Sequence, residues 1–351
     1  MSRTYLDWNA TAPLRPEARD AMLGAIGAVG NPSSVHFEGR RARAIVERAR
    51  AQVAEAFGAH PTEVVFTSGA TEAAALAMAG RNLGAARVEH ECVLAWAENV
   101  LETTADGRIV VPDPGNASAQ AANSETGILQ QLPPGLAVAD FAQAFGKTAC
   151  DFRSSGAEMA IISGHKTGGP AGVGALVVRE GRDVPPQILG GGQESGLRAG
   201  TENLPGIAGF GAAAEAASRD LEDGVWNRVA SLRDSFEMYI DELVPGTIFV
   251  GREAPRLPNT SCFALPGWDS ETQVIQMDLK GFSVSAGSAC SSGKVSRTGS
   301  PALQAMGFDA QTVRSAIRVS IGPSTRETDL MKFAEAWSAS SRRAVNRARA
   351  A

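Results

Sequence analysis

The amino-acid sequence predicts an α/β protein with a large domain and a smaller α+β domain. Short apolar stretches of strand type alternate with helical stretches, and each strand pattern ends in glycine or polar residues. The 351 residues include 38 glycines, 44% hydrophobic and 20% charged residues, which is typical of a globular chain with many tight turns. After Leu204 long helical patterns replace this alternation, and short strand patterns resume from about Pro245. This change marks the expected second domain.

The first part of the chain predicts helices and strands in turn. Residues 38–57 predict a surface helix ending at Gly58, because apolar side chains recur at helical spacing along one face. The strand pattern TEVVFT leads through Ser68 and Gly69 into a helix with Thr71 as its expected N-cap. Further strands are predicted within 136–145, 158–166 and 172–178. In an open parallel sheet, the carboxyl ends of such strands are where a site is expected.

The second part begins with two long helical patterns, 206–224 and 225–243, that are expected to bridge the domains. Strand patterns follow within 246–251, 259–267 and 317–322, and a last helix closes the chain. The basic C-terminal stretch SRRAVNRARA is interpreted as cations that complement the dipole of this helix, and an electrostatic contact is the alternative.

Charge and cysteine usage exclude several classes of protein. The formal net charge of -5 argues against nucleic acid or an anionic membrane as the main partner. The N-terminus lacks an apolar signal core and no run approaches ~20 apolar residues, so we expect a cytoplasmic protein. Four cysteines without CxxC spacing predict reduced thiols. The four histidines are scattered singly, so no metal site is expected.

Glycine-rich stretches offer one candidate anion site. Three of them, GGPAGVG, GGGQESG and GSACSSGKV, lack the arrangement of NAD- or ATP-binding loops. The stretch TSGATE differs, because a strand, a Ser-Gly turn and a helix N-terminus would present backbone N–H groups to an anion. An ordinary capped helix is the alternative.

The small residues around Lys166 suggest which anion this site could bind. Lys166 is surrounded by Gly164, Gly168, Gly169 and Pro170 at the end of a predicted strand, and Asp140 ends another. A fixed amine, a helix N-terminus and an aspartate are together the parts that pyridoxal phosphate requires. Taken singly, Lys166 could form an ion pair and Asp140 could cap a helix.

These residues lie within stretches that resemble the cysteine desulfurases of the NifS/IscS type, in the class V aminotransferase group, along nearly the whole chain. The resemblance implies the fold type I architecture, with a mostly parallel seven-stranded sheet in a large cofactor-binding domain, residues 14–244. A small α+β domain of residues 1–13 and 245–351 would carry the reactive cysteine. The matching stretches are YLDWNATAP, GNPSSVHFEGRRAR, VVFTSGATE, VEHECVL, ANSETG, ADFAQAFGK, SGHKTGGPAGVGALVV, GGGQESGLRAGTEN, SAGSACSSGKVS and AIRVSIG.

The resemblance also implies roles for single residues. Lys166 matches the Schiff-base lysine, and His90 the histidine that stacks on the cofactor ring and is a candidate acid or base. Arg318 matches the arginine that grips the substrate carboxylate, a task suited to a planar fork of donors. Asn123 matches the residue beside ring and substrate. The implied cofactor-binding residues are Ala70, Thr71, His90, Asn123, Asp140, Gln143, Ser163, His165, Lys166 and Thr201.

Within this set, Asp140 matches the partner of the pyridine nitrogen and Gln143 the contact of the phenolic oxygen. Thr201 matches a threonine that reaches the phosphate of the neighbouring subunit, which implies a homodimer. The phosphate donors are expected to be Ala70, Thr71, Ser163 and His165.

Cys290 separates a desulfurase from other enzymes of this fold. Its setting, SAGSACSSG, is built of small residues, which favours a thiol that can approach and leave a substrate; an ordinary buried cysteine is the alternative. The resemblance implies conversion of L-cysteine to L-alanine, with a persulfide on Cys290 whose sulfur passes to an iron-sulfur scaffold or a thiolation protein. Cys92, Cys150 and Cys262 are expected to fill the core.

Three departures from the family pattern stand out. Residues 100–123 are shorter than usual and leave no surface helix there, and the stretch from Cys290 to Gly307 is about two residues longer. Ser124 replaces the second asparagine of the common pattern. Rival hypotheses are another pyridoxal phosphate enzyme, such as a selenocysteine lyase, aminotransferase or β-lyase, and an interaction protein that has lost the reaction.

Overall fold

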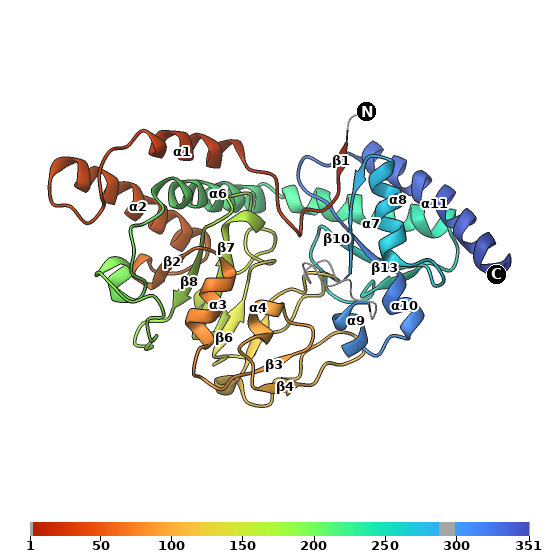
Figure 1. Ribbon diagram of the computed structural model, residues 1–351, viewed down its shortest axis with the longest axis horizontal. Coiled ribbons are helices and arrows are strands. Elements are labelled where there is room, and N and C mark those ends of the chain that lie inside the picture. Colours follow the sequence, from red (N-terminus) through yellow and green to blue (C-terminus); the bar gives the residue numbers. More distant parts are fainter. Residues whose placement is uncertain (1–2, 288–298, 351) are drawn as a thin grey trace.

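A computed structural model of the chain describes residues 3–287 and 299–350, with 343–350 described by their backbone alone. Figure 1 shows two parts: a large sheet covered by helices, and a smaller sheet packed against the C-terminal helices. This confirms the predicted α/β class. In the described ranges, no helix combines the length and the apolar character that crossing a membrane requires.

The large sheet is mostly parallel. Its five-stranded part has the order β2-β8-β7-β6-β5, in which β8 runs antiparallel to both neighbours and the other pairs are parallel. A parallel bridge from Gly84 to Ala117 continues it into the parallel pair β3-β4, so five and two strands give the predicted seven. The strands are β2 (Val64–Thr67), β3 (Gly84–Ala86), β4 (Asn99–Leu101), β5 (Ser118–Gln120), β6 (Val138–Asp140), β7 (Met159–Ser163) and β8 (Gly174–Val178).

Both faces of this sheet are buried, so its central strands read as continuous apolar runs. Along β7, Ile162 packs on one face and Ile161 on the other, because side chains alternate across a strand. One face carries α1 (Pro16–Ile26), α2 (Phe37–Ala56) and α6 (Leu204–Glu222), and the other carries α3 (Ala70–Met78) and α4 (Glu91–Leu94).

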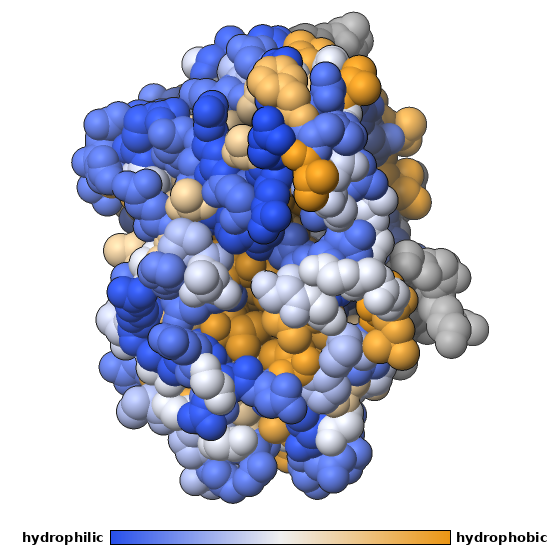
Figure 2. Space-filling view, turned by 90° about the vertical axis from the view of Figure 1, so that its left-hand side faces the viewer, coloured by the Kyte–Doolittle hydropathy of each residue, from blue (hydrophilic) through white to orange (hydrophobic). Residues whose placement is uncertain are grey.

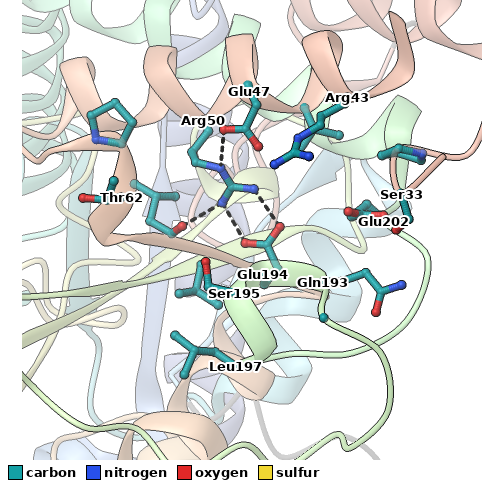
Figure 3. A pocket seen from close by; sticks show the side chains of 16 residues that line it. Ser33, Arg43, Glu47, Arg50, Thr62, Gln193, Glu194, Ser195, Leu197 and Glu202 are labelled. Atoms are coloured by element: carbon teal, nitrogen blue, oxygen red, sulfur yellow. Dashed lines mark hydrogen bonds and ion pairs between the residues drawn. The ribbon is translucent and has the colours of Figure 1, made fainter. Parts of the chain in front are cut away.

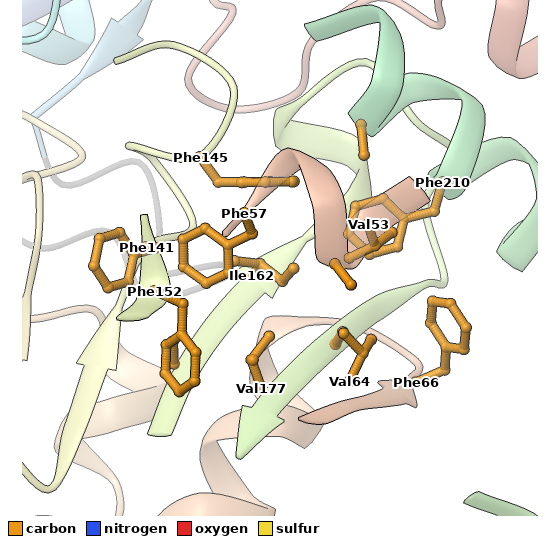
Figure 4. Packing of buried hydrophobic residues seen from close by; sticks show 14 of the residues in the cluster. Val53, Phe57, Val64, Phe66, Phe141, Phe145, Phe152, Ile162, Val177 and Phe210 are labelled. Carbon is orange, nitrogen blue, oxygen red and sulfur yellow. The ribbon is translucent and has the colours of Figure 1, made fainter. Parts of the chain in front are cut away.

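A cluster of phenylalanines fixes α2 and α6 on the sheet (Figure 4). Phe57, just after α2, packs edge-on against Phe141 and Phe145, with ring centroids 5.0 and 5.2 Å apart. Phe141 and Phe145 belong to the turn that follows Asp140, so this packing also holds the end of β6 in place.

The smaller sheet is antiparallel, in the order β12-β13-β10-β9. The N-terminal residues join this part, since β1 (Thr4–Tyr5) pairs with β11 (Phe282–Ser283) and Asp7 bridges to Ser320. Its other elements are α7 (Val225–Leu243), β9 (Ile248–Val250), β10 (Thr260–Ala264), α8 (Ser270–Leu279), β12 (Ser285–Ala286), α9 (Pro301–Ala305), α10 (Ala310–Ser315), β13 (Ala316–Ser320) and α11 (Glu327–Ala350).

The helix α7 packs into the second core: Trp226, Phe236 and Ile240 are buried with Phe263 of β10 and Trp337 of α11. The division of the chain at residue 244 therefore stays a prediction. Between β4 and β5 the structure has a short 3-10 turn, Pro114–Asn116, and no α-helix in residues 102–117, as the shortened stretch predicted.

Candidate active site

One cavity of about 430 Å³ opens at the edge of the large sheet where β2, β5, β6 and β7 have their carboxyl ends. Its volume is in the range of sites for small cofactors. Nine of the predicted site residues line it: Ala70, Thr71, His90, Asp140, Gln143, Ser163, His165, Lys166 and Arg318.

Lys166 ends a 3-10 turn, Gly164–Lys166, that directly follows β7. Its Nζ donates hydrogen bonds to the carbonyl oxygens of Asn9 at 2.6 Å and Ala10 at 2.8 Å, so the N-terminal segment holds the amine. Gly168 has a φ of +89°, which side chains rarely adopt. The small residues around Lys166 thus let the chain turn sharply beneath a fixed amine.

Asp140 is the last residue of β6, and its Oδ1 accepts a hydrogen bond of 2.8 Å from the Ala142 N–H. Asp140 therefore holds this turn and also lines the cavity. Burial raises the pKa of Asp140, while the charges of His90 and Lys166 lower it.

Glu89 is a second buried carboxyl near Asp140, and the sequence analysis missed it. Its Oε1 accepts the Gln120 N–H at 2.7 Å, whereas its Oε2 has no hydrogen-bond partner among the described residues. Burial, and then the charge of Asp140, raise the pKa of Glu89 well above its usual range. The sequence signal that could have identified Glu89 is its position directly before the predicted site residue His90.

His90 caps the N-terminus of α4: its Nδ1 accepts the Cys92 N–H at 3.1 Å. Because Nδ1 acts as an acceptor, the neutral ring carries its proton on Nε2. The Sγ of Cys92 lies 3.0 Å from the same Nδ1. Cys92 is buried in the core under α3, as predicted, and it also lines the cavity.

The other two described cysteines are core residues as predicted. Cys262 is fully buried, and burial raises its pKa far above the ordinary value. Cys150 packs against the phenylalanine cluster, and burial raises its pKa to about 12.

The helix α3 begins at Ala70, with Gly69 as N-cap and no side-chain capping bond. The expected N-cap role of Thr71 is therefore wrong, because the backbone turns one residue earlier and Thr71 lies inside the first turn. Thr71 lines the cavity instead. The N–H groups at the start of α3 face no partner within the helix.

Further polar residues lie beside the start of α3. The Ser68 N–H donates to Glu72 at 2.9 Å, and Glu72 pairs with Arg198 at 2.8 Å. His165 Nδ1 lies 2.7 Å from the Thr11 hydroxyl. Burial, and then the charges of Lys166 and Lys147, lower the pKa of His165 to about 4, so its ring is neutral at pH 7.

Gln143 lies between Asn9 and a second lysine that the sequence analysis did not single out. Its Nε2 donates to the Asn9 carbonyl at 3.0 Å, and its Oε1 accepts from Lys147 Nζ at 2.6 Å. Lys147 also lies 3.4 Å from Asn9 Oδ1. Burial, then the charges of Lys166 and Arg318, lower the pKa of Lys147 well below its usual range. This network fixes the Gln143 amide.

Arg318 stands in β13 and reaches the cavity from the smaller sheet. It donates to Asp7 Oδ1 at 2.6 Å and to the Ser124 carbonyl at 2.9 Å. Its Nε has no partner among the described residues. Asp7 is thus a further residue of the site, in the stretch YLDWNATAP.

Two predicted residues lie elsewhere, and a third cannot be placed. The Asn123 side chain donates to the Val88 carbonyl at 2.9 Å and accepts from the Thr126 N–H at 2.8 Å, so it holds the turn next to the cavity. Thr201 is exposed and lines an adjoining cavity of about 250 Å³ that shares Ser68 with the first. Cys290 lies outside the described residues.

A separate cavity of about 360 Å³ surrounds the pair Arg50–Glu194 (Figure 3). Arg50 donates to both Glu194 oxygens, at 2.7 and 2.8 Å, and Glu194 also accepts the Phe66 N–H at 2.9 Å. Glu194 and Ser195 have φ values of +46° and +56°. The buried pair holds this left-handed loop, which leads to Thr201, against β2.

The fold and this arrangement agree with comparisons to known proteins. The chain belongs to the aminotransferase class-V family, whose model matches residues 4–114 and 117–333. It is 36% identical to the cysteine desulfurase of Frankia sp. (strain EuIK1), over 94% of this chain and 89% of that protein.

Solved structures give the same result. The NifS-like protein from Rickettsia africae ESF-5 aligns with a TM-score of 0.85 and 29% identity, covering 95% of this chain and 98% of that one. A structure described as SspA in complex with cysteine aligns with a TM-score of 0.75 and 28% identity, covering 92% and 99%. These findings confirm the predicted family and fold.

Proposed function

We propose that the chain is a pyridoxal phosphate-dependent cysteine desulfurase that converts L-cysteine to L-alanine and takes the sulfur on Cys290. One observation carries the proposal: Lys166, the buried Asp140 and the N-terminus of α3 line one cavity of about 430 Å³. The names of its relatives, and the cysteine complex of a structural neighbour, support this substrate.

The residues present fit this cofactor. Lys166 offers an amine for covalent attachment, and Asp140 offers a buried carboxylate for the pyridine nitrogen. The first N–H groups of α3, with Thr71, Ser163 and the neutral His165, form a donor set for a phosphate. His90 would lie against the ring, and Gln143 would contact its phenolic oxygen. When bound, the cofactor supplies an electron-accepting ring that weakens bonds at the substrate α-carbon.

The protein residues would orient the substrate and move its protons. Arg318 is held by Asp7 and Ser124, and its remaining donors suit the L-cysteine carboxylate. Lys166 would remove the proton from the substrate α-carbon, because two backbone carbonyls hold its amine in the cavity. His90 would offer a proton through Nε2.

Cys290 would act as a thiolate, the nucleophilic form of the side chain. Its sulfur forms a bond to the substrate sulfur as the substrate Cβ–S bond breaks. The electron pair of the broken bond remains on carbon, which takes a proton to give the methyl group of alanine. The resulting Cys290 persulfide would pass its sulfur to an acceptor protein such as an iron-sulfur scaffold.

We also infer a homodimer in which Thr201 reaches the cofactor phosphate of the partner. Thr201 is exposed beside the site, and large apolar residues are exposed on the same chain in 23–37. Figure 2 shows a face with apolar surface in a hollow, bordered by polar residues. Exposed apolar surface of this kind favours an interface. Within 23–37 the most exposed apolar residues are Leu23 at 61%, Ile26 at 64%, Val29 at 82% and Val35 at 87%.

The proposed two-domain division, residues 14–244 against 1–13 and 245–351, would place Arg318 on the small domain and Lys166 on the large one. A cytoplasmic location agrees with the free thiols of Cys92, Cys150 and Cys262.

The cofactor proposal is tested by adding pyridoxal phosphate to the purified protein, reducing with borohydride, and mapping the modified peptide by mass spectrometry. We expect the label on Lys166, with no label in Lys166→Ala. Label on the buried Lys147, which bonds to Gln143 in the same site, or on surface lysines alone, would contradict the assignment.

A further inference from the structure

Glu125 occupies a position between the proposed active site and the chain on either side of Cys290. It follows Ser124, whose carbonyl binds Arg318, and its own N–H donates to Asn123 Oδ1 at 2.9 Å. Its side chain faces away from this turn toward Ser300. Nothing in the proposed mechanism uses this carboxylate.

A single oxygen of Glu125 lies at both flanks of the segment 288–298. Its Oε2 accepts a hydrogen bond of 2.5 Å from the Ser300 hydroxyl, which in turn accepts the Leu303 N–H at 3.1 Å as the cap of α9. On the other flank, a Cβ built on Gly287 would lie 3.1 Å from the same Oε2 and 3.2 Å from the Ser300 Cβ. Gly287, just before the segment, and Ser300, just after it, thus both lie beside the Glu125 carboxylate.

Both flanks are also attached to the smaller part of the protein. The Gly287 N–H donates to the Ala316 carbonyl at 3.2 Å, and the Ser300 N–H donates to the Val313 carbonyl at 3.5 Å. Glu125 itself belongs to the turn beside the large sheet. It therefore connects the flanks of the Cys290 segment to the turn that holds Arg318.

We propose that Glu125 is a positioning residue for Cys290: its hydrogen bond ties Ser300 to the substrate-binding turn while its carboxylate lies beside Gly287, and it so fixes where the nucleophile's segment begins and ends. The consequence for sulfur transfer rests on the proposed function. The tie itself does not, because it is made between described residues.

The test compares Glu125→Ala with Glu125→Gln, which keeps an oxygen acceptor for Ser300. Glu91→Ala is the control, since Glu91 and Glu125 both line a small cavity of about 60 Å³ but Glu91 is exposed. Hydrogen exchange of the backbone amides at 285–287 and 299–303 is measured by mass spectrometry in the cofactor-loaded protein. Alanine formation from L-cysteine is measured in parallel.

We expect Glu125→Ala to speed exchange at both flanks by on the order of tenfold, as for a lost charge-assisted hydrogen bond, and to slow alanine formation with unchanged cofactor loading. Glu125→Gln should keep most of the wild-type protection from exchange and most of the rate of alanine formation. Glu91→Ala should match the wild type in both measurements. Ser300→Ala removes the same bond from the other side and serves if Glu125→Ala does not fold.

Exchange at wild-type rates in both Glu125→Ala and Ser300→Ala would overturn the proposal. So would faster exchange with an unchanged rate of alanine formation. If the wild type forms no alanine but Glu125→Ala still speeds exchange, the proposed function fails and the tie stands.

Discussion

Replacing Gly174 by alanine should displace the turn that we propose for the cofactor phosphate. Gly174 begins β8 and packs on the backbone of Gly69, the N-cap of α3. A Cβ at Gly174 would lie 2.8 Å from Gly69 Cα and 2.8 Å from the Ile162 carbonyl oxygen. Ile162 is central in the sheet, so the Gly69 turn should give way.

The size of the effect follows from this geometry. Ordinary contacts begin at 3.4 Å, so the turn must move by the difference from 2.8 Å, about 0.6 Å. An N–H···O bond of about 2.9 Å lengthened by that amount leaves the hydrogen-bonding range. Each lost bond to a charged phosphate is worth about 1.5–3 kcal/mol, which weakens affinity by about 10- to 150-fold. Overpacking should also reduce the free energy of unfolding by about 1–3 kcal/mol.

The assay is a titration of the cofactor-free protein with pyridoxal phosphate, followed by absorbance, together with denaturant unfolding. Gly115→Ala is the matched control, because Gly115 lies in the exposed turn Pro114–Asn116 and an added Cβ there meets only Asp113 Oδ1, at an ordinary 3.8 Å. That variant should bind as the wild type does and keep its stability within about 0.5 kcal/mol. A folded Gly174→Ala protein with wild-type affinity would refute the phosphate assignment at this turn.

Three further predictions concern buried charges. Glu237→Ala should lower the free energy of unfolding by about 3–5 kcal/mol in denaturant, because Arg256, which donates to it at 2.8 and 3.0 Å, would stay buried without its partner; a loss below 1 kcal/mol would contradict this. Burial raises the pKa of Glu125 from 4.5 to about 7, so the folded state favours the protonated carboxyl. The stability of the wild type relative to Glu125→Gln should therefore fall as pH rises from about 4.5 to about 7, by on the order of 3 kcal/mol, and stay level above; a difference independent of pH would count against it. Arg318→Lys should raise the KM for L-cysteine about 10- to 100-fold, because an ammonium cannot reproduce the planar fork, and an unchanged KM would argue against carboxylate binding there.

The strands and helices were predictable because their signals are local. The apolar runs that became β2, β6, β7 and β8, and the helical periodicity of α2, lie within a few residues of their terminating glycines or polar residues. The N-cap of α3 was missed for the same reason. Whether Gly69 or Thr71 caps depends on where the backbone turns, and both residue types are compatible with the sequence pattern.

The site was predictable where one residue type stood out from its neighbours, as Lys166 did among glycines. Glu89, Lys147 and Asp7 were missed because their burial depends on segments far away in the chain. Lys147, for example, is enclosed with Asn9, which lies 138 positions earlier. Composition and spacing do not report such contacts, and charged residues are mostly exposed.

The central claim is that this cavity removes sulfur from L-cysteine through Cys290. The most direct measurement is alanine formation from L-cysteine with a thiol reductant, comparing the cofactor-loaded wild type with Cys290→Ala. The account predicts alanine from the wild type and none from the variant, whose cofactor loading should be normal. Equal alanine from both proteins would contradict sulfur transfer to Cys290, and none from either would contradict the proposed substrate.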